Sequence, residues 1–214
     1  MDYTSGTKEN VLAVDDEPSS KEQARALGYA VRAAMTMHEQ ALLDAKIFHH
    51  VQENWDWNEI ERVHVYLPLA RRREIGTWAL VRWLWAAHPD IKVYVPRMLN
   101  DGGLEHIEVN HDTRFRPNHY EIPEPMVGHL LQPDEPLDMV ITPLLAYDLE
   151  GNRVGYGAGY YDRFLSEHPK ALRVGLAYGD CLVKGGIKAE KHDIPLQVIV
   201  TEHGITTIGA EAER

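Results

Sequence analysis

The chain has little cysteine, no excess of positive charge and no long apolar run. Its one cysteine, Cys181, excludes an internal disulfide framework and a cysteine-rich zinc site, and is typical of proteins from a reducing compartment. The 22 basic residues face 33 acidic ones, so the formal net charge is −11, which disfavours nonspecific binding to nucleic acid or anionic membranes. No apolar segment approaches the roughly 20 residues that a membrane span needs. The sequence therefore predicts a cytoplasmic protein that binds neither nucleic acid nor membrane.

The length and composition indicate one globular domain with two short extensions. The chain has 214 residues, of which 44% are hydrophobic and 26% charged, ordinary values for a protein with a sizeable core. Residues 1–19 are polar and acidic and predict a flexible N-terminal arm. We expect the domain to span residues 20–203 and residues 204–214 to form a C-terminal tail.

Apolar residues recur at helical spacing in three segments, and short apolar runs separate them. The first helix follows Ser19 and Glu22, which have the spacing of a capping box; the second lies around Ile47, and the third runs from Glu74 to about His88. The expected strands are residues 63–67, 91–95, 106–109, 139–142, 172–178 and 198–201. Residues 117–136 are rich in proline and predict mainly loop. Strands that alternate with helices favour an α/β fold with a largely parallel sheet and right-handed crossovers.

The most informative segment is glycine-rich. Gly155, Gly157 and Gly159 stand within five residues, so the backbone can turn tightly and approach a ligand closely. Successive N–H groups of such a turn bind anions, and a helix that begins near Tyr160 points its positive end the same way. The spacing is neither that of a P-loop nor that of a dinucleotide-binding turn. Spacing alone therefore leaves two alternatives, an anion-binding loop or a glycine-rich hairpin before a helix.

Charged residues flank these glycines. Arg153 and Arg163 can neutralise phosphate oxygens, and Asp162 can hold a magnesium ion that bridges those phosphates. No convincing pair of a nucleophile and a base accompanies them. The segment therefore favours chemistry by positioning and charge neutralisation.

The complete string from Gly151 to Asp162 resembles the signature Gly-x-Arg-x-Gly-x-Gly-x-Gly-Tyr-Tyr-Asp of the 5-formyltetrahydrofolate cyclo-ligase family, also called methenyltetrahydrofolate synthetases. Further landmarks in that family's order extend the resemblance over about residues 20–203. They are Lys21 and Arg25, Glu74-Ile-Gly-Thr77, Pro96-Arg97-Met98, Tyr120-Glu-Ile-Pro-Glu-Pro125 and His192-Asp193-Ile-Pro195. Residues 71–73, three consecutive arginines, depart from the family's pattern. They either meet the glutamate tail of folate or form a solvated turn.

The resemblance implies a three-layer α/β/α fold, similar to that of glucosamine-phosphate isomerases and CoA transferases. It also implies a ligase that uses ATP and Mg²⁺ to convert 5-formyltetrahydrofolate to 5,10-methenyltetrahydrofolate, with release of ADP and phosphate. In this family the formyl oxygen takes the terminal phosphoryl group of ATP, the neighbouring nitrogen attacks, and phosphate departs. The folate would carry one glutamate or a polyglutamate tail, and the chain would be a monomer or a weak homodimer.

The resemblance also assigns roles to residues at matching positions. ATP would be bound by Lys21, Arg25, Arg153, Gly155, Tyr156, Gly157, Ala158, Gly159, Tyr160 and Tyr161. Folate would be bound by Leu67, Glu74, Met98, Tyr120 and Tyr156, with the Glu74 carboxylate accepting hydrogen bonds from the ring N–H groups. Arg153, Tyr160 and Arg163 would act in catalysis, and Asp162 and Asp193 would bind Mg²⁺.

Other functional classes stay open at this point. A sugar-phosphate isomerase on the same fold would bind phosphate but would need neither ATP nor magnesium. A paralogue would act on a related formylated amine. A non-catalytic folate-binding relative would bind its ligand without turnover, and the intact string from Arg153 to Asp162 argues against it.

Overall fold

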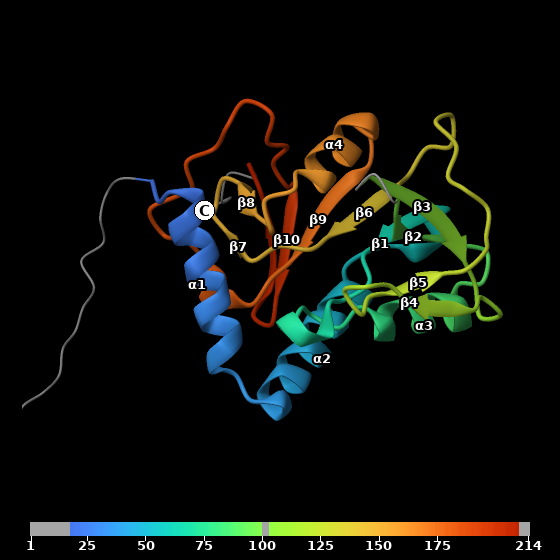
Figure 1. Cartoon of the computed structure of the whole chain (residues 1–214), viewed down its shortest axis with the longest axis horizontal. Helices are drawn as coiled ribbons and strands as arrows, with labels where there is room; N and C mark the ends of the chain where they lie inside the picture. The colour runs from blue at the N-terminus through green and yellow to red at the C-terminus, as the bar shows by residue number, and fades with distance from the viewer. Residues whose placement is uncertain (1–17, 100–102, 210–214) are drawn as a thin grey trace, which may run out of the picture.

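A seven-stranded sheet forms the centre of the computed structural model, which describes residues 18–99 and 103–209 (Figure 1). Residues 1–17 of the expected arm lie outside the described residues. The strand order is β11-β10-β9-β6-β1-β2-β3; the inner strands are parallel to one another, and the edge strands β3 and β11 are antiparallel to their neighbours. The bounds are β1 (Arg62–Val65), β2 (Lys92–Met98), β3 (Leu104–Val109), β6 (Met139–Thr142), β9 (Leu172–Leu176), β10 (Val198–Thr201) and β11 (Gly204–Thr207).

Side chains of the inner strands alternate between two apolar cores. In β1, Val63 and Val65 belong to the larger core, whereas His64 between them meets Phe164 of the smaller core. Helices α1 (Lys21–Ala34), α2 (Met37–Glu53) and α3 (Trp78–Ala87) contribute to the larger core, and α4 (Tyr160–Glu167) covers the smaller one. In Figure 1, α4 lies above the sheet, and α2 and α3 lie below it. Helices on both faces confirm the expected three-layer α/β/α class.

Several element boundaries differ from the expected ones. Ser20, not Ser19, caps α1, and Gln23 takes the reciprocal position expected of Glu22. Strand β2 continues through Pro96, because β1 pairs with β2 only as far as Tyr94 and a proline is tolerated where one neighbour is missing. Strand β11 lies within the stretch expected as a C-terminal tail and pairs with β10.

The remaining elements are short. Residues 117–136 are mainly irregular, as expected, but they contain one strand of a small hairpin that the sequence analysis did not identify. These elements are β4 (Phe115–Pro117), β5 (Pro123–Pro125), β7 (Ala146–Tyr147), β8 (Arg153–Val154), and the 3₁₀ helices η1 (Trp57–Glu59), η2 (Ala70–Arg72) and η3 (Gly179–Cys181). Among the described helices, none has the length and apolar character needed to cross a membrane.

The close approach of α1 to the segment directly before β7 depends on Gly28. A Cβ atom at this position would lie 2.2 Å from the carbonyl oxygen of Leu145, well inside van der Waals contact. Ala24, Gly28 and Arg32 form the buried stripe of the helix. Because α1 also carries Lys21, this contact helps to place a candidate ligand-binding side chain.

We expect Gly28→Ala to lower the free energy of unfolding by about 2 kcal/mol, because the helix must move away from Leu145. Helix propensity alone would give the opposite sign, a gain of about 1 kcal/mol. Urea unfolding followed by circular dichroism measures the change. The control is Ala33→Gly, an exposed position of α1 that should lose about 1 kcal/mol through propensity alone. A Gly28→Ala variant more stable than the wild type contradicts the tight contact.

Candidate active site

Two pockets lie next to each other at the carboxyl ends of the parallel strands, the usual ligand-binding edge of an open α/β sheet. The first, about 220 Å³, lies between α1, the glycine-rich turn and residues 190–193, and we call it the cationic pocket. The second, about 290 Å³, is lined by the segments that follow β1 and by the end of β2, and we call it the apolar pocket. Both pockets are lined by Pro143, Tyr156, Ala158, Tyr160 and Tyr161. Ligands in the two pockets would therefore meet at the turn.

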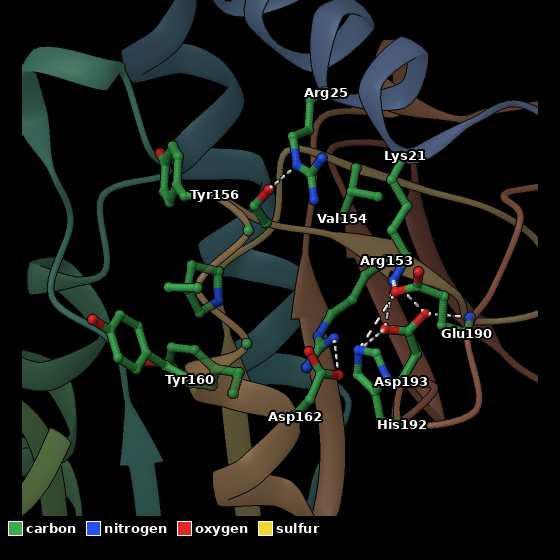
Figure 2. A pocket seen from close by; sticks show the side chains of 16 residues that line it. Lys21, Arg25, Arg153, Val154, Tyr156, Tyr160, Asp162, Glu190, His192 and Asp193 are labelled. Carbon is green, nitrogen blue, oxygen red and sulfur yellow. Dashed lines mark hydrogen bonds and ion pairs between the residues drawn. The ribbon is translucent and has the colours of Figure 1, made fainter. Parts of the chain in front are cut away.

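The structure brings together all ten residues that the resemblance assigns to ATP, because all ten line the cationic pocket. Gly157 and Gly159 have φ angles of 95° and 66°, which favour glycine, and α4 begins at Tyr160 as expected. Figure 2 shows Lys21, Arg153 and the acidic side chains on one side of this turn, and Tyr156 and Tyr160 on the other.

Arg153 and Asp162 form a buried ion pair across the turn. Arg153 Nη1 donates to Asp162 Oδ1 at 3.0 Å, and the two side chains are 5% and 18% exposed. The same Oδ1 accepts the Ile194 N–H at 3.1 Å. Arg153 Nη2 is buried and has no hydrogen-bond partner within the described part of the chain. An unsatisfied guanidinium nitrogen beside a pocket favours an anionic ligand, since a buried donor without a partner is costly.

Lys21 lies in an acidic corner of the same pocket. Its Nζ donates to Glu190 Oε2 at 2.6 Å and to Asp193 Oδ1 at 2.8 Å. Burial lowers the pKa of Lys21, but the hydrogen bonds and charges of Asp193 and Glu190 outweigh it, so the pKa is raised. Burial raises the pKa of Asp193, but the hydrogen bond and the charge of Lys21 outweigh burial, so the pKa is lowered overall. All three groups therefore stay charged at neutral pH.

The candidate metal ligands differ in part from the expected pair. Glu190, His192 and Asp193 offer ligand atoms within 4.8 Å of one another, and Asp162 is not a member of this group. Glu190 has no role assigned from the sequence. In the structure it belongs to the same turn as Asp193, because its N–H donates to Asp193 Oδ2 at 2.7 Å. Two carboxylates beside an anion pocket fit a hard cation such as Mg²⁺, which prefers oxygen ligands.

Of two other arginines with expected roles, Arg25 lines the cationic pocket and Arg163 does not. Arg25 lines the cationic pocket, and its Nε donates to the Gly155 carbonyl at 2.9 Å. Arg163 is exposed, lies over the Tyr160 ring at 5.2 Å and donates to the Ala158 carbonyl at 3.1 Å. It lines neither pocket, so the structure does not bring this expected catalytic residue to the ligand-binding surfaces.

The apolar pocket contains all five residues expected to bind folate: Leu67, Glu74, Met98, Tyr120 and Tyr156. The sequence analysis missed other lining residues, among them Ile122 and Glu124, although both lie within the landmark that begins at Tyr120. Glu74 is 6% exposed; its Oε2 accepts the Leu69 N–H at 2.6 Å, and its Oε1 accepts the Tyr156 hydroxyl at 2.6 Å. A buried carboxylate among apolar side chains provides a strong acceptor for ligand N–H groups.

The segment that carries Glu74 is irregular rather than helical, because three side chains hold its backbone. Gln40 Nε2 donates to the Glu74 carbonyl at 3.1 Å, the Tyr66 hydroxyl donates to the Ile75 carbonyl at 3.0 Å, and Asp44 Oδ2 accepts the Gly76 N–H at 3.0 Å. Helix α3 therefore begins at residue 78, four residues later than expected.

Arg32 is a functional candidate that the sequence analysis missed. Its side chain is buried; Nη2 donates to the Leu144 carbonyl at 2.6 Å, and Nη1 donates to the Tyr156 hydroxyl at 3.1 Å. The hydroxyl in turn donates to Glu74. Its spacing from Gly28 on one helix face is the signal that the sequence offered, because an arginine in a buried stripe needs polar partners.

The comparisons with known proteins agree with this arrangement. A model described as the 5-formyltetrahydrofolate cyclo-ligase family matches residues 17–202. The chain belongs to this family. Among its relatives, the 5-formyltetrahydrofolate cyclo-ligase of Haemophilus influenzae is 28% identical over 179 residues, covering 82% of this chain and 94% of that one. The Escherichia coli K12 protein of the same name is 34% identical over 131 residues, covering 60% and 71%.

Solved structures have the same fold. The 5,10-methenyltetrahydrofolate synthetase of Aquifex aeolicus superposes with a TM-score of 0.76 at 24% identity, covering 91% of this chain and 95% of that one. The synthetase of Mycoplasma pneumoniae has a TM-score of 0.66 at 21% identity, covering 85% and 98%. The expected family is thus confirmed, and with it the ligase class of the enzyme.

Two buried histidines pack between α4 and the sheet. The rings of His64 and His106 contact each other with 2.9 Å between His64 Nε2 and His106 Nδ1, and His106 stacks on Phe164 of α4 with 3.7 Å between ring centroids. Burial lowers the pKa of His64 well below its ordinary value and that of His106 to about 3. Both rings are therefore neutral in the folded enzyme at physiological pH.

This pair predicts acid sensitivity. The unfolded chain binds protons on these histidines below about pH 6.5, whereas the folded chain does not, so stability is complete above that pH and falls as the pH drops. Between pH 7 and 5 His106 alone should remove about 2 kcal/mol of unfolding free energy. Denaturant unfolding at several pH values measures this loss. His106→Gln should reduce the loss, and the exposed His111→Gln should not; equal losses in wild type and His106→Gln contradict the assignment.

Proposed function

We propose that the enzyme converts 5-formyltetrahydrofolate to 5,10-methenyltetrahydrofolate with Mg²⁺ and ATP, releasing ADP and phosphate. The observation that carries this proposal is the shared wall of the two pockets. A cationic pocket suited to phosphates and an apolar pocket with a buried carboxylate meet at Tyr156, Tyr160 and Tyr161. The family match and the names of the relatives support the same reaction. The single buried cysteine fits a reducing compartment, so we propose a cytoplasmic enzyme, and we propose that it acts as a monomer or a weak homodimer.

In the cationic pocket, Lys21, Arg25 and Arg153 bind the phosphates of ATP, together with the backbone of the glycine-rich turn. The free Nη2 of Arg153 donates a hydrogen bond to a phosphate oxygen. Asp193 and Glu190 hold Mg²⁺, which supplies neutralisation of the phosphate charge when bound. Such a transfer needs positioned charges rather than a protein nucleophile. This agrees with Cys181, whose thiol pKa is raised to about 11 by burial and which lines neither pocket.

In the apolar pocket, Glu74 accepts hydrogen bonds from the N–H groups of the pterin ring, and Leu67, Met98 and Tyr120 contact its faces. This position brings the formyl group to Tyr160 at the shared wall. The formyl oxygen takes the terminal phosphoryl group of ATP, the neighbouring nitrogen attacks the activated carbon, and phosphate departs. Holding both reactants in place supplies most of the rate enhancement.

The decisive experiment is a turnover assay with 5-formyltetrahydrofolate, Mg²⁺ and ATP, followed by the absorbance of the methenyl product. We expect turnover that requires both ATP and Mg²⁺. The double variant Arg153→Ala with Asp162→Ala should lower kcat at least about a hundredfold, because it removes charge stabilisation without leaving one member of the buried pair unpaired.

The matched control is Lys92→Ala with Glu108→Ala, which removes another ion pair outside both pockets and should keep full activity. Calorimetry with ATP separates the possible failures. ATP binding without turnover would redirect the assignment to another formylated substrate. A protein that does not bind ATP would overturn the cyclo-ligase assignment and favour an isomerase-like one.

We further propose that the arginines at the rim of the apolar pocket bind the carboxylates of the folate tail. Arg71 and Arg72 line this pocket and are exposed. In the described part of this strongly acidic chain, neither forms an ion pair with a carboxylate. Arg71 lies over the Tyr120 ring at 5.8 Å, which orients its guanidinium at the rim. Unpaired, oriented cations at a pocket mouth favour an anionic extension of the ligand.

We expect Arg71→Ala to raise KM for a triglutamate substrate about tenfold and to leave kcat unchanged, because a contact remote from the reacting atoms is lost equally in ground and transition states. KM for the monoglutamate should rise less. Arg82→Ala is the control, since Arg82 is also exposed and lies over an aromatic ring, that of Trp78, at 5.9 Å outside both pockets. An equal rise in KM for both substrates would mean that Arg71 supports the pocket without binding the glutamate tail.

A further inference from the structure

Tyr156 is hydrogen-bonded to the Glu74 carboxylate, the group that would accept hydrogen bonds from the proposed folate substrate. Its hydroxyl donates to Glu74 Oε1 at 2.6 Å, and the other carboxylate oxygen already accepts the Leu69 N–H. Burial and the charge of Glu74 raise the pKa of Tyr156, so the hydroxyl keeps its proton and remains a donor. A pterin N–H that approaches Oε1 from the side of the Tyr156 hydroxyl therefore competes with Tyr156. This step rests on the proposed function.

Further contacts hold the Tyr156 side chain in place. The side chain is held further by Arg32 Nη1, which donates to its hydroxyl at 3.1 Å, and by Arg72, whose guanidinium lies 5.0 Å from the ring centroid. The hydroxyl thus links a buried cation to a buried carboxylate.

The same residue is part of the nucleotide turn. The carbonyl of Gly155, directly before Tyr156, accepts the Arg25 Nε–H at 2.9 Å, and Gly157, directly after it, has a φ of 95°. Figure 2 shows Tyr156 on the side of the turn away from Lys21, while Arg25 reaches the turn from α1. A displacement of Tyr156 that includes its backbone would shift the neighbouring Gly155 carbonyl that accepts from Arg25, and the glycines on both sides of Tyr156 make such a backbone change easier.

We propose that Tyr156 couples the two pockets by competing with the folate ring for Glu74. When folate takes Glu74 Oε1, Tyr156 leaves, the Gly155 carbonyl moves and Arg25 becomes free to bind a phosphate oxygen. Folate then increases the affinity for nucleotide. Coupling of binding free energies is reciprocal, so nucleotide increases the affinity for folate by the same factor.

Calorimetric titration of the full chain with Mg²⁺ and the β,γ-imido analogue of ATP, with and without saturating 5-formyltetrahydrofolate, measures the coupling. In the wild type, folate should lower the Kd of the analogue about tenfold. Tyr156→Phe should reduce this factor to about one, because it binds the analogue without folate as tightly as the wild type does with folate. It should also bind folate roughly fivefold more tightly, since nothing competes for Glu74.

The matched control is Tyr29→Phe, which removes a nearby hydroxyl that accepts from Arg72 Nη1 at 2.7 Å and does not contact Glu74; it should keep the coupling. Thermal unfolding checks that each variant is folded. In addition, folate alone should increase hydrogen exchange of residues 153–160 in the wild type, a measurement that needs no variant. Binding of both ligands with no coupling, coupling that survives in Tyr156→Phe, or unchanged exchange each overturns the Tyr156 role alone. A wild type that binds neither ligand overturns the proposed function as well.

Discussion

Both pockets depend on the buried ion pair between Arg153 and Asp162. Arg153 lies before the glycine-rich turn and Asp162 in the first turn of α4, so their bond closes the turn from both ends. Because both side chains are largely buried, solvent screens the pair only weakly, and loss of one partner would leave an uncompensated charge. Asp162 also accepts the Ile194 N–H, next to Asp193. The Asp162 carboxylate therefore connects the glycine-rich turn to the segment that carries Asp193.

In this acidic chain, the proposed anion site depends on local charges that are arranged in pairs. The net charge of −11 repels phosphates at long range, whereas at the pocket each cation already has an oxygen partner. Lys21 bonds Glu190 and Asp193, and Arg153 bonds Asp162. Phosphate binding is thus an exchange of partners. Carboxylates that take a divalent cation leave the Lys21 ammonium free for a phosphate oxygen, which explains physically why nucleotide and Mg²⁺ would bind together.

The sequence predicts the parts of the site that depend on local rules. Glycines at tight turns, a helix start at Tyr160 and the existence of the central strands follow from backbone sterics and periodicity. The residues that the resemblance assigns to the two ligands all line the two pockets. Contacts between distant segments were not predictable. Three side chains keep the Glu74 segment out of helical conformation: Gln40 and Asp44 from α2, and Tyr66 directly after β1. Helical spacing after Glu74 therefore gave too early a helix start. The same limit applies to Arg32, whose partners lie far along the chain.

The burial of Glu74 also determines which ligands the apolar pocket can accept. A carboxylate that is 6% exposed cannot return to water when a ligand enters, so it must be hydrogen-bonded in the free enzyme and in the complex. In the free enzyme Tyr156 and the Leu69 N–H meet this need, and Arg32 contributes positive charge nearby. A flat ligand with N–H donors can replace Tyr156, whereas an isostere without them leaves the charge unpaired. Sites of this kind reject such analogues by roughly 10⁴-fold. Selectivity in this pocket therefore comes from one buried acceptor, and the apolar residues around it supply the area that makes binding favourable.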